Sequence, residues 1–293
     1  MLPSPMAEAT RGEFTHNGHK LVYDERGSGR RVVVLVPGLL LPRRMHWPLA
    51  DALAERGNRV ICLDLLAHGE SDHPRDMALY SMPLFGEQVI ALLDELEIDE
   101  AVVGGTSLGA NVSLDVATRV PERLRGMVVE MPVLDNALLG CAIAFTPLLL
   151  WLTFGSPLAT PTARIFGALP RGLHQHADTM LDWLAQPPGP SSAVLQGLFF
   201  GRTAPPREER KQIETKALVI GHGRDPIHPF SDSDALVNEL PNAKLLQANS
   251  ILELRLRPDR LTKEIGDFID ACWKPRSASA RGKRSGAKRR RSA

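Results

Sequence analysis

The chain has 293 residues, 43% of them hydrophobic and 24% charged, a length and composition that allow a sizeable core and exclude a mostly disordered chain. The formal net charge of +1 conceals an asymmetry, because residues 274–293 hold nine Lys or Arg and no acid, which leaves about −8 (+1 minus +9) on residues 1–273. The sequence therefore predicts a mildly acidic globular body followed by a basic tail.

The N-terminus and the cysteines indicate a cellular compartment. The first 14 residues contain no positive region followed by an apolar run, so we expect no signal peptide. The three cysteines, Cys62, Cys141 and Cys272, are odd in number, widely spaced and without a CxxC pair, which suits a reducing environment. We therefore expect a cytoplasmic protein.

Short apolar strands alternate with amphipathic helices along most of the chain. Residues 13–25 predict an antiparallel hairpin that turns at Asn17-Gly18, a dipeptide that tolerates the positive φ of a tight turn. We predict further strands at 32–36, 59–63, 101–103, 127–129, 217–220 and 244–248, and helices at 47–55, 84–96, 108–119 and 258–273. This alternation indicates an α/β fold with a mostly parallel, doubly wound sheet.

The alternation lapses in the middle of the chain. Residues 136–211 are rich in Leu, Pro and Gly and too long for a simple connection, so we predict an inserted helical cap. The α/β core would then comprise residues 1–135 and 212–273, and residues 274–293 would be a disordered tail because they lack large apolar side chains.

The cap contains an uncharged run, residues 137–155, that is long enough to cross a bilayer. Pro147 interrupts this run, and the later strands must return to the same sheet, so a single span is excluded. We expect the run to line an apolar pocket, and peripheral contact with a membrane is the alternative. The aromatic residues predicted to line this pocket are Phe145, Trp151 and Phe154.

The motif with the most chemical content is Gly105-Thr106-Ser107-Leu108-Gly109, between a predicted strand and a predicted helix. A serine in this G-x-S-x-G pattern lies on a sharp turn, and the flanking glycines are needed because a β-carbon would clash with the neighbouring elements. The turn would present the Ser107 hydroxyl at the positive end of a helix, where a developing anion is stabilised. The sequence thus predicts a nucleophilic serine.

A second turn follows the strand at 32–36, where Gly38 allows a sharp change of direction. The backbone N–H groups of Leu39 and Leu108 could together form an oxyanion hole, whose donors typically contribute about 3 kcal/mol each to transition-state stabilisation. A purely structural turn is the alternative.

Four segments in this order carry a family resemblance: the hairpin whose ERGSG leads into VVVLVPG, then DLLAHGESD at 64–72, then GGTSLGA, then ALVIGHGRDPIHP at 217–229. The chain resembles the α/β hydrolases, a superfamily of esterases, lipases, epoxide hydrolases and C–C bond hydrolases. The resemblance implies the fold rather than a substrate. It also implies that Asp225 is the catalytic acid, since the Asp-Pro-x-x-Pro pattern after a strand is reproduced here.

The histidine of the family is missing from its usual place. Relatives carry Gly-His just after the last strand, whereas this chain has QANSILELR at 247–255 and no later histidine. A serine is a weak nucleophile without a base, so another imidazole would have to serve. His228, three residues after Asp225, is our first candidate, and His222, His174 and His176 are alternatives. For each, the other interpretation is a surface or hydrogen-bonded structural histidine, which is the more frequent role of a lone histidine.

Glu130 is the last unusual residue, because it ends the strand before the cap and a buried carboxylate is costly unless it is paired. We expect it to be the partner of an arginine rather than a catalyst.

These observations predict a serine hydrolase of a hydrophobic carboxylic ester or related acyl compound, with a small apolar substrate. The alternative is a non-catalytic or chemically divergent member of the fold that binds an apolar ligand after losing its base. The sequence has no metal-ligand cluster and no Walker or dinucleotide motif, so no metal or cofactor is expected. The basic tail would allow weak contact with anionic lipid or nucleic acid.

Overall fold

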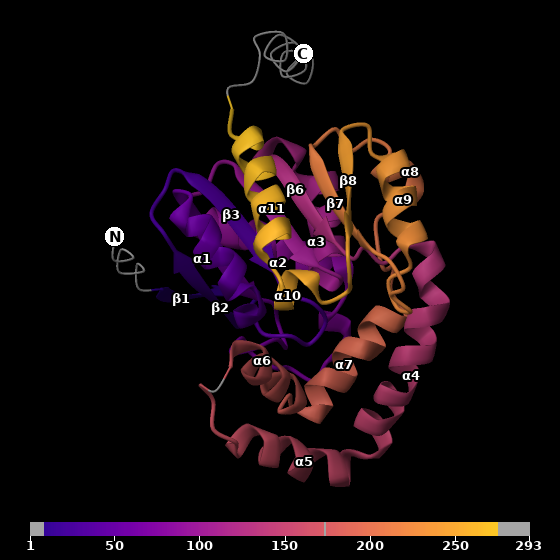
Figure 1. Cartoon of the computed structure of the whole chain (residues 1–293). Helices are drawn as coiled ribbons and strands as arrows, with labels where there is room; N and C mark the ends of the chain where they lie inside the picture. The colour runs from indigo at the N-terminus through magenta and orange to yellow at the C-terminus, as the bar shows by residue number, and fades with distance from the viewer. Residues whose placement is uncertain (1–8, 173, 275–293) are drawn as a thin grey trace, which may run out of the picture.

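A computed structural model of the chain describes residues 9–172 and 174–274, so the predicted basic tail, apart from Lys274, lies outside the described residues. An eight-stranded sheet with the order β1-β2-β4-β3-β5-β6-β7-β8 forms its centre (Figure 1). The pairs β1–β2 and β2–β4 are antiparallel and the others are parallel, which confirms the predicted α/β fold. The strands are β1 Thr10–His16, β2 His19–Arg26, β3 Arg31–Val36, β4 Asn58–Asp64, β5 Ala101–Thr106, β6 Leu124–Glu130, β7 Ala217–His222 and β8 Ala243–Ala248.

Helices cover both faces of the sheet (Figure 1). One face packs against α2, α3 and α9, and the other packs against α1 and α11. Strand β3 shows why both faces must be covered. Alternate residues of its unbroken Val and Leu run point into the two opposite cores. The core helices are α1 Trp47–Glu55, α2 Met82–Glu95, α3 Leu108–Arg119, α8 Arg207–Arg210, α9 Phe230–Glu239, α10 Glu253–Leu256 and α11 Asp259–Cys272.

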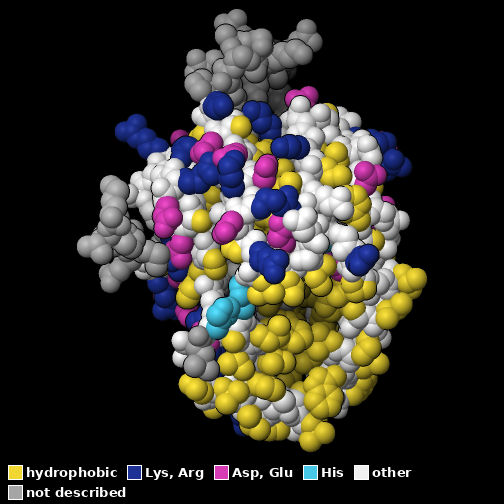
Figure 2. Space-filling view, in the orientation of Figure 1, with side chains coloured by type: hydrophobic (Ala, Val, Ile, Leu, Met, Phe, Trp, Pro, Cys, Tyr) yellow, Lys and Arg dark blue, Asp and Glu magenta, His cyan; other side chains and the backbone are white. Residues whose placement is uncertain are grey.

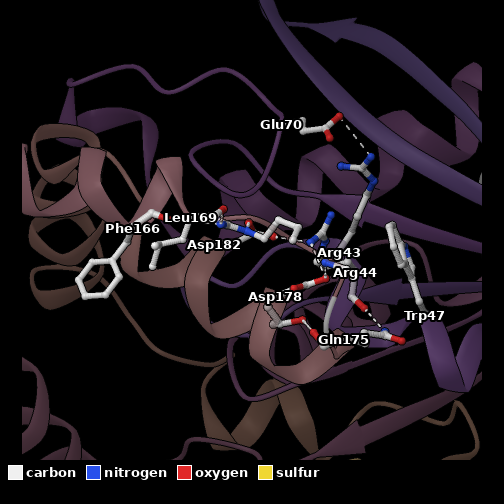
Figure 3. Close-up of polar contacts among 12 residues, drawn as sticks. Arg43, Arg44, Trp47, Glu70, Phe166, Leu169, Gln175, Asp178 and Asp182 are labelled. Carbon is white, nitrogen blue, oxygen red and sulfur yellow. Dashed lines mark hydrogen bonds and ion pairs between the residues drawn. The ribbon is translucent and has the colours of Figure 1, made fainter.

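Between β6 and the short helix α8, the chain forms four α-helices that we call the helical insertion: α4 Leu138–Phe154, α5 Ser156–Ala168, α6 Gln175–Leu184 and α7 Pro188–Phe199. Figure 1 shows α4 running down one edge of the molecule and α5 crossing its lower end, with α7 and α6 closer to the core. The insertion is joined to the core by polar contacts at α6, where Gln175 donates to the Arg44 carbonyl at 2.7 Å and Asp182 pairs with the Arg44 guanidinium at 3.1 Å (Figure 3).

A buried carboxylate fixes the point where the insertion begins. Asp232, in α9, accepts hydrogen bonds from the backbone N–H groups of Leu134 (2.7 Å), Asn136 (3.0 Å) and Ala137 (3.0 Å), just before α4. This one side chain thus gives a charged acceptor to three amides just before α4, of which Ala137 N also donates to the Leu134 carbonyl at 3.2 Å.

We expect Asp232→Ala to lower the free energy of unfolding by about 3 kcal/mol, because three backbone donors lose a charged acceptor. Urea denaturation would measure this change. Asp234→Ala is the matched control, because Asp234 lies in the same helix but is exposed, and its loss should change stability by less than about 0.5 kcal/mol. Equal stability of the two variants would contradict the anchoring role of Asp232.

Candidate active site

Ser107 lies on a strained turn between β5 and α3. Its φ of 54° and ψ of −108° are unusual for a residue other than glycine. A β-carbon on Gly105 would lie 2.5 Å from the Val36 carbonyl oxygen, and one on Gly109 would lie 2.1 Å from the same atom. Both glycines are therefore required by close packing, as the motif predicts. Ser107 N also donates to the Glu130 carbonyl at 2.8 Å, which ties the turn to β6.

The loop between β7 and α9 brings an imidazole to this serine. His228 Nε2 lies 2.8 Å from Ser107 Oγ, and His228 Nδ1 lies 2.9 Å from Asp225 Oδ2. Because an ionised carboxylate can only accept hydrogen bonds, the proton of the neutral imidazole must be on Nδ1. Nε2 is then free to accept the hydrogen bond of the Ser107 hydroxyl. The structure thus joins three of the predicted site residues in one chain of hydrogen bonds.

Asp225 also organises its own loop. Its second oxygen, Oδ1, accepts the backbone N–H groups of Ile227 at 2.9 Å and His228 at 3.0 Å. Burial alone would raise the pKa of the Asp225 carboxyl, but the hydrogen bonds from the His228 side chain and backbone outweigh burial and lower it below its ordinary value. The carboxylate is therefore ionised at neutral pH, and it sets both the loop conformation and the orientation of the imidazole.

The other candidate histidines contact different groups. His222 is buried, with Nδ1 2.9 Å from the Ser250 carbonyl oxygen and Nε2 3.6 Å from Glu130 Oε1. His174 accepts the backbone N–H of His176 at the start of α6. His176 Nε2 contacts the carbonyl of Arg255. None of these contacts is with Ser107.

Glu130 is paired with an arginine, as expected. Arg255, in α10, donates to Glu130 Oε2 at 2.9 Å and to the Thr106 hydroxyl at 3.0 Å, and Thr106 donates to the same carboxylate. Burial would raise the pKa of Glu130, but the Arg255 guanidinium, followed by His222 and Thr106, holds it well below its usual range. The segment in which relatives carry their histidine therefore supplies an arginine to a buried ion pair beside the Ser107 turn. The sequence pattern did not identify this partner.

An apolar pocket of about 370 Å³ opens at Ser107. Its polar lining residues besides the serine are Asn111 and Thr203. Asn111 is a further residue that the sequence did not single out. Its amide joins α3 to the segments on either side of the insertion by donating to the carbonyls of Val133 (2.7 Å) and Thr203 (2.6 Å). The apolar lining comes mainly from α4 and α7 and includes Leu138, Cys141, Ala142, Phe145, Leu195, Leu198 and Phe199.

The predicted aromatic lining is correct for Phe145 and wrong for Trp151 and Phe154. Phe154 is exposed, and Trp151 lines a separate cavity between the helices of the insertion. At about 100° and 1.5 Å per residue, Phe154 is on the side of α4 opposite Phe145 and roughly 13 Å further along its axis. A uniformly apolar helix gives no periodicity from which the buried side could be predicted.

The two predicted oxyanion donors also line this pocket. Leu39 follows β3, and Leu108 is the first residue of α3, where an N–H has no acceptor within the helix. The turn at 38–41 is closed by a hydrogen bond from Leu41 N to the Gly38 carbonyl at 3.0 Å. Its positive φ of 57° falls on Leu40 and not on Gly38, so the sharp change of direction that was attributed to Gly38 is made by Leu40.

A larger cavity of about 550 Å³ lies at the junction of α6 with the core and is lined by arginines and carboxylates. Figure 3 shows that these groups pair with one another, including Arg43 with Glu70 at 3.3 Å and Arg44 with Asp182 at 3.1 Å. Ser107, Asp225 and His228 are absent from its lining. The charged groups of this cavity thus already pair with one another. The smaller pocket at Ser107 is therefore the candidate active site.

We expect Arg255→Met to lower the free energy of unfolding by about 3–5 kcal/mol, because it leaves the Glu130 carboxylate buried without its cation. Adding Glu130→Gln should restore part of the loss, since the uncompensated charge is then removed. Denaturant unfolding would measure both variants. Arg257→Met, at an exposed neighbouring position, is the control. If it were as destabilising as Arg255→Met, the ion pair would not be the cause.

Comparison with known proteins agrees with the fold. A model of the alpha/beta hydrolase fold family matches residues 31–249. Two 2-hydroxymuconate semialdehyde hydrolases are similar in sequence. That of Pseudomonas sp. (strain CF600) is 28% identical over 68% of this chain and 71% of its own length. That of Pseudomonas putida is 31% identical over 64% of this chain and 67% of its own length.

Among solved structures, the enol-lactonase from Burkholderia xenovorans LB400 superposes with a TM-score of 0.72 at 21% identity, covering 88% of this chain and all of its own. A thermophilic esterase from Thermogutta terrifontis gives a TM-score of 0.69 at 21% identity, covering 91% of this chain and 99% of its own. The structural likeness shows a shared fold, and the family match covers most of the sequence. The chain therefore belongs to the α/β-hydrolase fold family, and its relatives support a hydrolase.

Proposed function

We propose that the protein is a serine hydrolase that cleaves a hydrophobic carboxylic ester or a related acyl compound. The observation that carries this proposal is the chain of hydrogen bonds from Ser107 Oγ through His228 to Asp225, at 2.8 and 2.9 Å. These distances are those of a nucleophile within reach of its base and a base oriented by a carboxylate.

In the proposed reaction, Ser107 Oγ attacks the acyl carbonyl carbon while His228 Nε2 takes the hydroxyl proton. The negative charge on the carbonyl oxygen is held by the N–H groups of Leu39 and Leu108, and Asp225 stabilises the imidazolium. When this tetrahedral intermediate collapses, the bond between the acyl carbon and the leaving alcohol breaks, and the alcohol receives the proton from His228. Water then attacks the acyl-enzyme with His228 again as base, and an acid is released with Ser107 restored.

The pocket supports an apolar acyl group as the part of the substrate that is recognised. Its walls from α4 and α7 are aliphatic and aromatic, and its polar side chains, Ser107, Asn111 and Thr203, are few. Such a surface gains free energy from burying hydrocarbon and has little to offer a charged substrate.

The alternative, a binding protein that lost its base, rested on the missing histidine after β8. In the structure His228 approaches the serine from the β7–α9 loop, so the absence of the later histidine no longer favours that alternative.

We expect a fluorophosphonate probe to label the wild-type protein and to fail with Ser107→Ala and His228→Ala. Labelling needs both the nucleophile and the base that activates it. Mass spectrometry of the labelled peptide would locate the adduct. His174→Ala is the matched control, because this imidazole caps α6 instead of contacting the serine, and its labelling should equal that of the wild type.

Steady-state hydrolysis of a short nitrophenyl ester would test the complete triad. We expect Asp225→Asn and His228→Ala each to lower kcat/KM by about 10³–10⁴-fold, because the imidazole is either misoriented or absent. Full activity of His228→Ala would identify another base and contradict the mechanism.

A further inference from the structure

The outward side of α4 and α5 is apolar over an unusual length. From 136 to 163 the chain has no charged side chain. Within the described residues, Asp135–Phe154 is long and apolar enough to cross a membrane, with a mean hydropathy of 2.0, yet only 6% of its most apolar window is buried. A core helix of a soluble protein with this composition would be mostly buried, so the exposure of this one calls for a physical explanation.

The exposed side chains form a stripe. Leu139, Ile143 and Phe154 are 72%, 67% and 78% exposed, and their spacing places them on one side of α4. We call the following set the outer apolar face: Leu139, Ile143, Leu150, Phe154, Leu158 and Ile165. Figure 2 shows a continuous hydrophobic surface over the helical insertion, in contrast to the mixed charges over the core.

The chemistry of this face fits lipid better than a protein partner. Protein interfaces combine an apolar centre with a polar rim and about one hydrogen bond per 100–200 Å². The outer apolar face instead offers hydrocarbon and aromatic side chains on two helices, whose backbone hydrogen bonds are internal except where Pro147 and Pro161 lack a donor. Helical backbone of this kind suits a hydrocarbon environment.

Basic side chains at the border of this face fit phosphate headgroups. Arg164 lies in α5 beside Ile165, and Arg224 lies in the loop against which α4 begins; both are exposed. Figure 2 shows Lys and Arg side chains along the upper border of the hydrophobic surface. Apolar residues flanked by cations are typical of helices that lie in the interfacial plane of a membrane.

The fold allows this helix to lie on a membrane but not to cross it. On its inner side, α4 contributes Phe145 and Cys141 to the pocket of Ser107 and is hydrogen-bonded to α7 through Thr153 and Ser192 at 2.7 Å. The chain must also return through α5, α6 and α7 to β7. One helix therefore separates the outer apolar face from the pocket.

We propose that the outer apolar face docks on the surface of a lipid bilayer, with α4 and α5 in the interfacial plane. Docking brings α4, the wall that separates the outer apolar face from the Ser107 pocket, to the bilayer, from which an apolar acyl substrate enters. This route of the substrate, but not the docking itself, rests on the proposed hydrolase function.

Co-sedimentation of the full-length protein with phosphatidylcholine vesicles tests the docking. Zwitterionic lipid and about 0.15 M salt keep the attraction of the basic tail small. We expect the wild type and Ser107→Ala to bind equally, and the double variant Leu139→Asp/Phe154→Asp to bind at least about tenfold more weakly, because two anchors become charges. Leu256→Asp, an exposed leucine outside α4 and α5, is the matched control and should bind as the wild type.

The double variant should hydrolyse a short soluble ester at the wild-type rate, because neither position lines the pocket, and this rate verifies its fold. Wild-type protein that stays in the supernatant, or a double variant that binds as the wild type does, overturns the proposal. So does a lipid-free dimer that the two substitutions dissociate, since a second copy would then cover the face. Because Ser107→Ala is tested for binding alone, failure of docking and failure of catalysis are distinguishable.

Discussion

The close approach of β3, β5 and α3 at the Ser107 turn is the constraint on which the site depends. The Val36 carbonyl oxygen leaves no room for a β-carbon at Gly105 or Gly109, so the chain between them must pass through the positive φ adopted by Ser107. This geometry aims the hydroxyl away from the sheet. Because the carboxyl ends of parallel strands share one edge, the turn after β3 and the loop after β7 meet it there.

The proposed acid, Asp225, and the proposed base, His228, come from one short loop, so a residue of that same loop positions the imidazole. Asp225 binds two backbone amides through one oxygen and His228 Nδ1 through the other, so the loop conformation and the ring orientation are set by the same carboxylate. In the proposed mechanism the segment after β8 has no catalytic role. There Arg255 neutralises Glu130, whose buried charge would otherwise destabilise the strand that holds the backbone of Ser107.

Features that depend on local backbone geometry were predictable from the sequence. Features that depend on distances between residues far apart in the chain were not. The G-x-S-x-G motif and the alternation of elements impose the Ser107 turn and the parallel sheet through backbone sterics and periodicity. His228 was one of four candidate imidazoles, and only its 2.8 Å approach to Ser107 distinguishes it. The uniform composition of α4 concealed that Phe145 faces the pocket and Phe154 faces outward, and Arg255 gave no local signal of its partner.

The exposure of α4 is compatible with a rigid candidate active site because the helix is anchored at its N-terminal end, near His228. Gly140 packs so closely against the loop of His228 that a β-carbon there would lie 2.6 Å from the Pro226 carbonyl oxygen, and Asp232 holds the amides just before the helix. Beyond Pro147, α4 packs instead on α5 and α7. The pocket wall beside Ser107 therefore stays fixed to the loop that holds His228. The far half of the helix presents its apolar side chains without disturbing the hydrogen bonds among Ser107, His228 and Asp225.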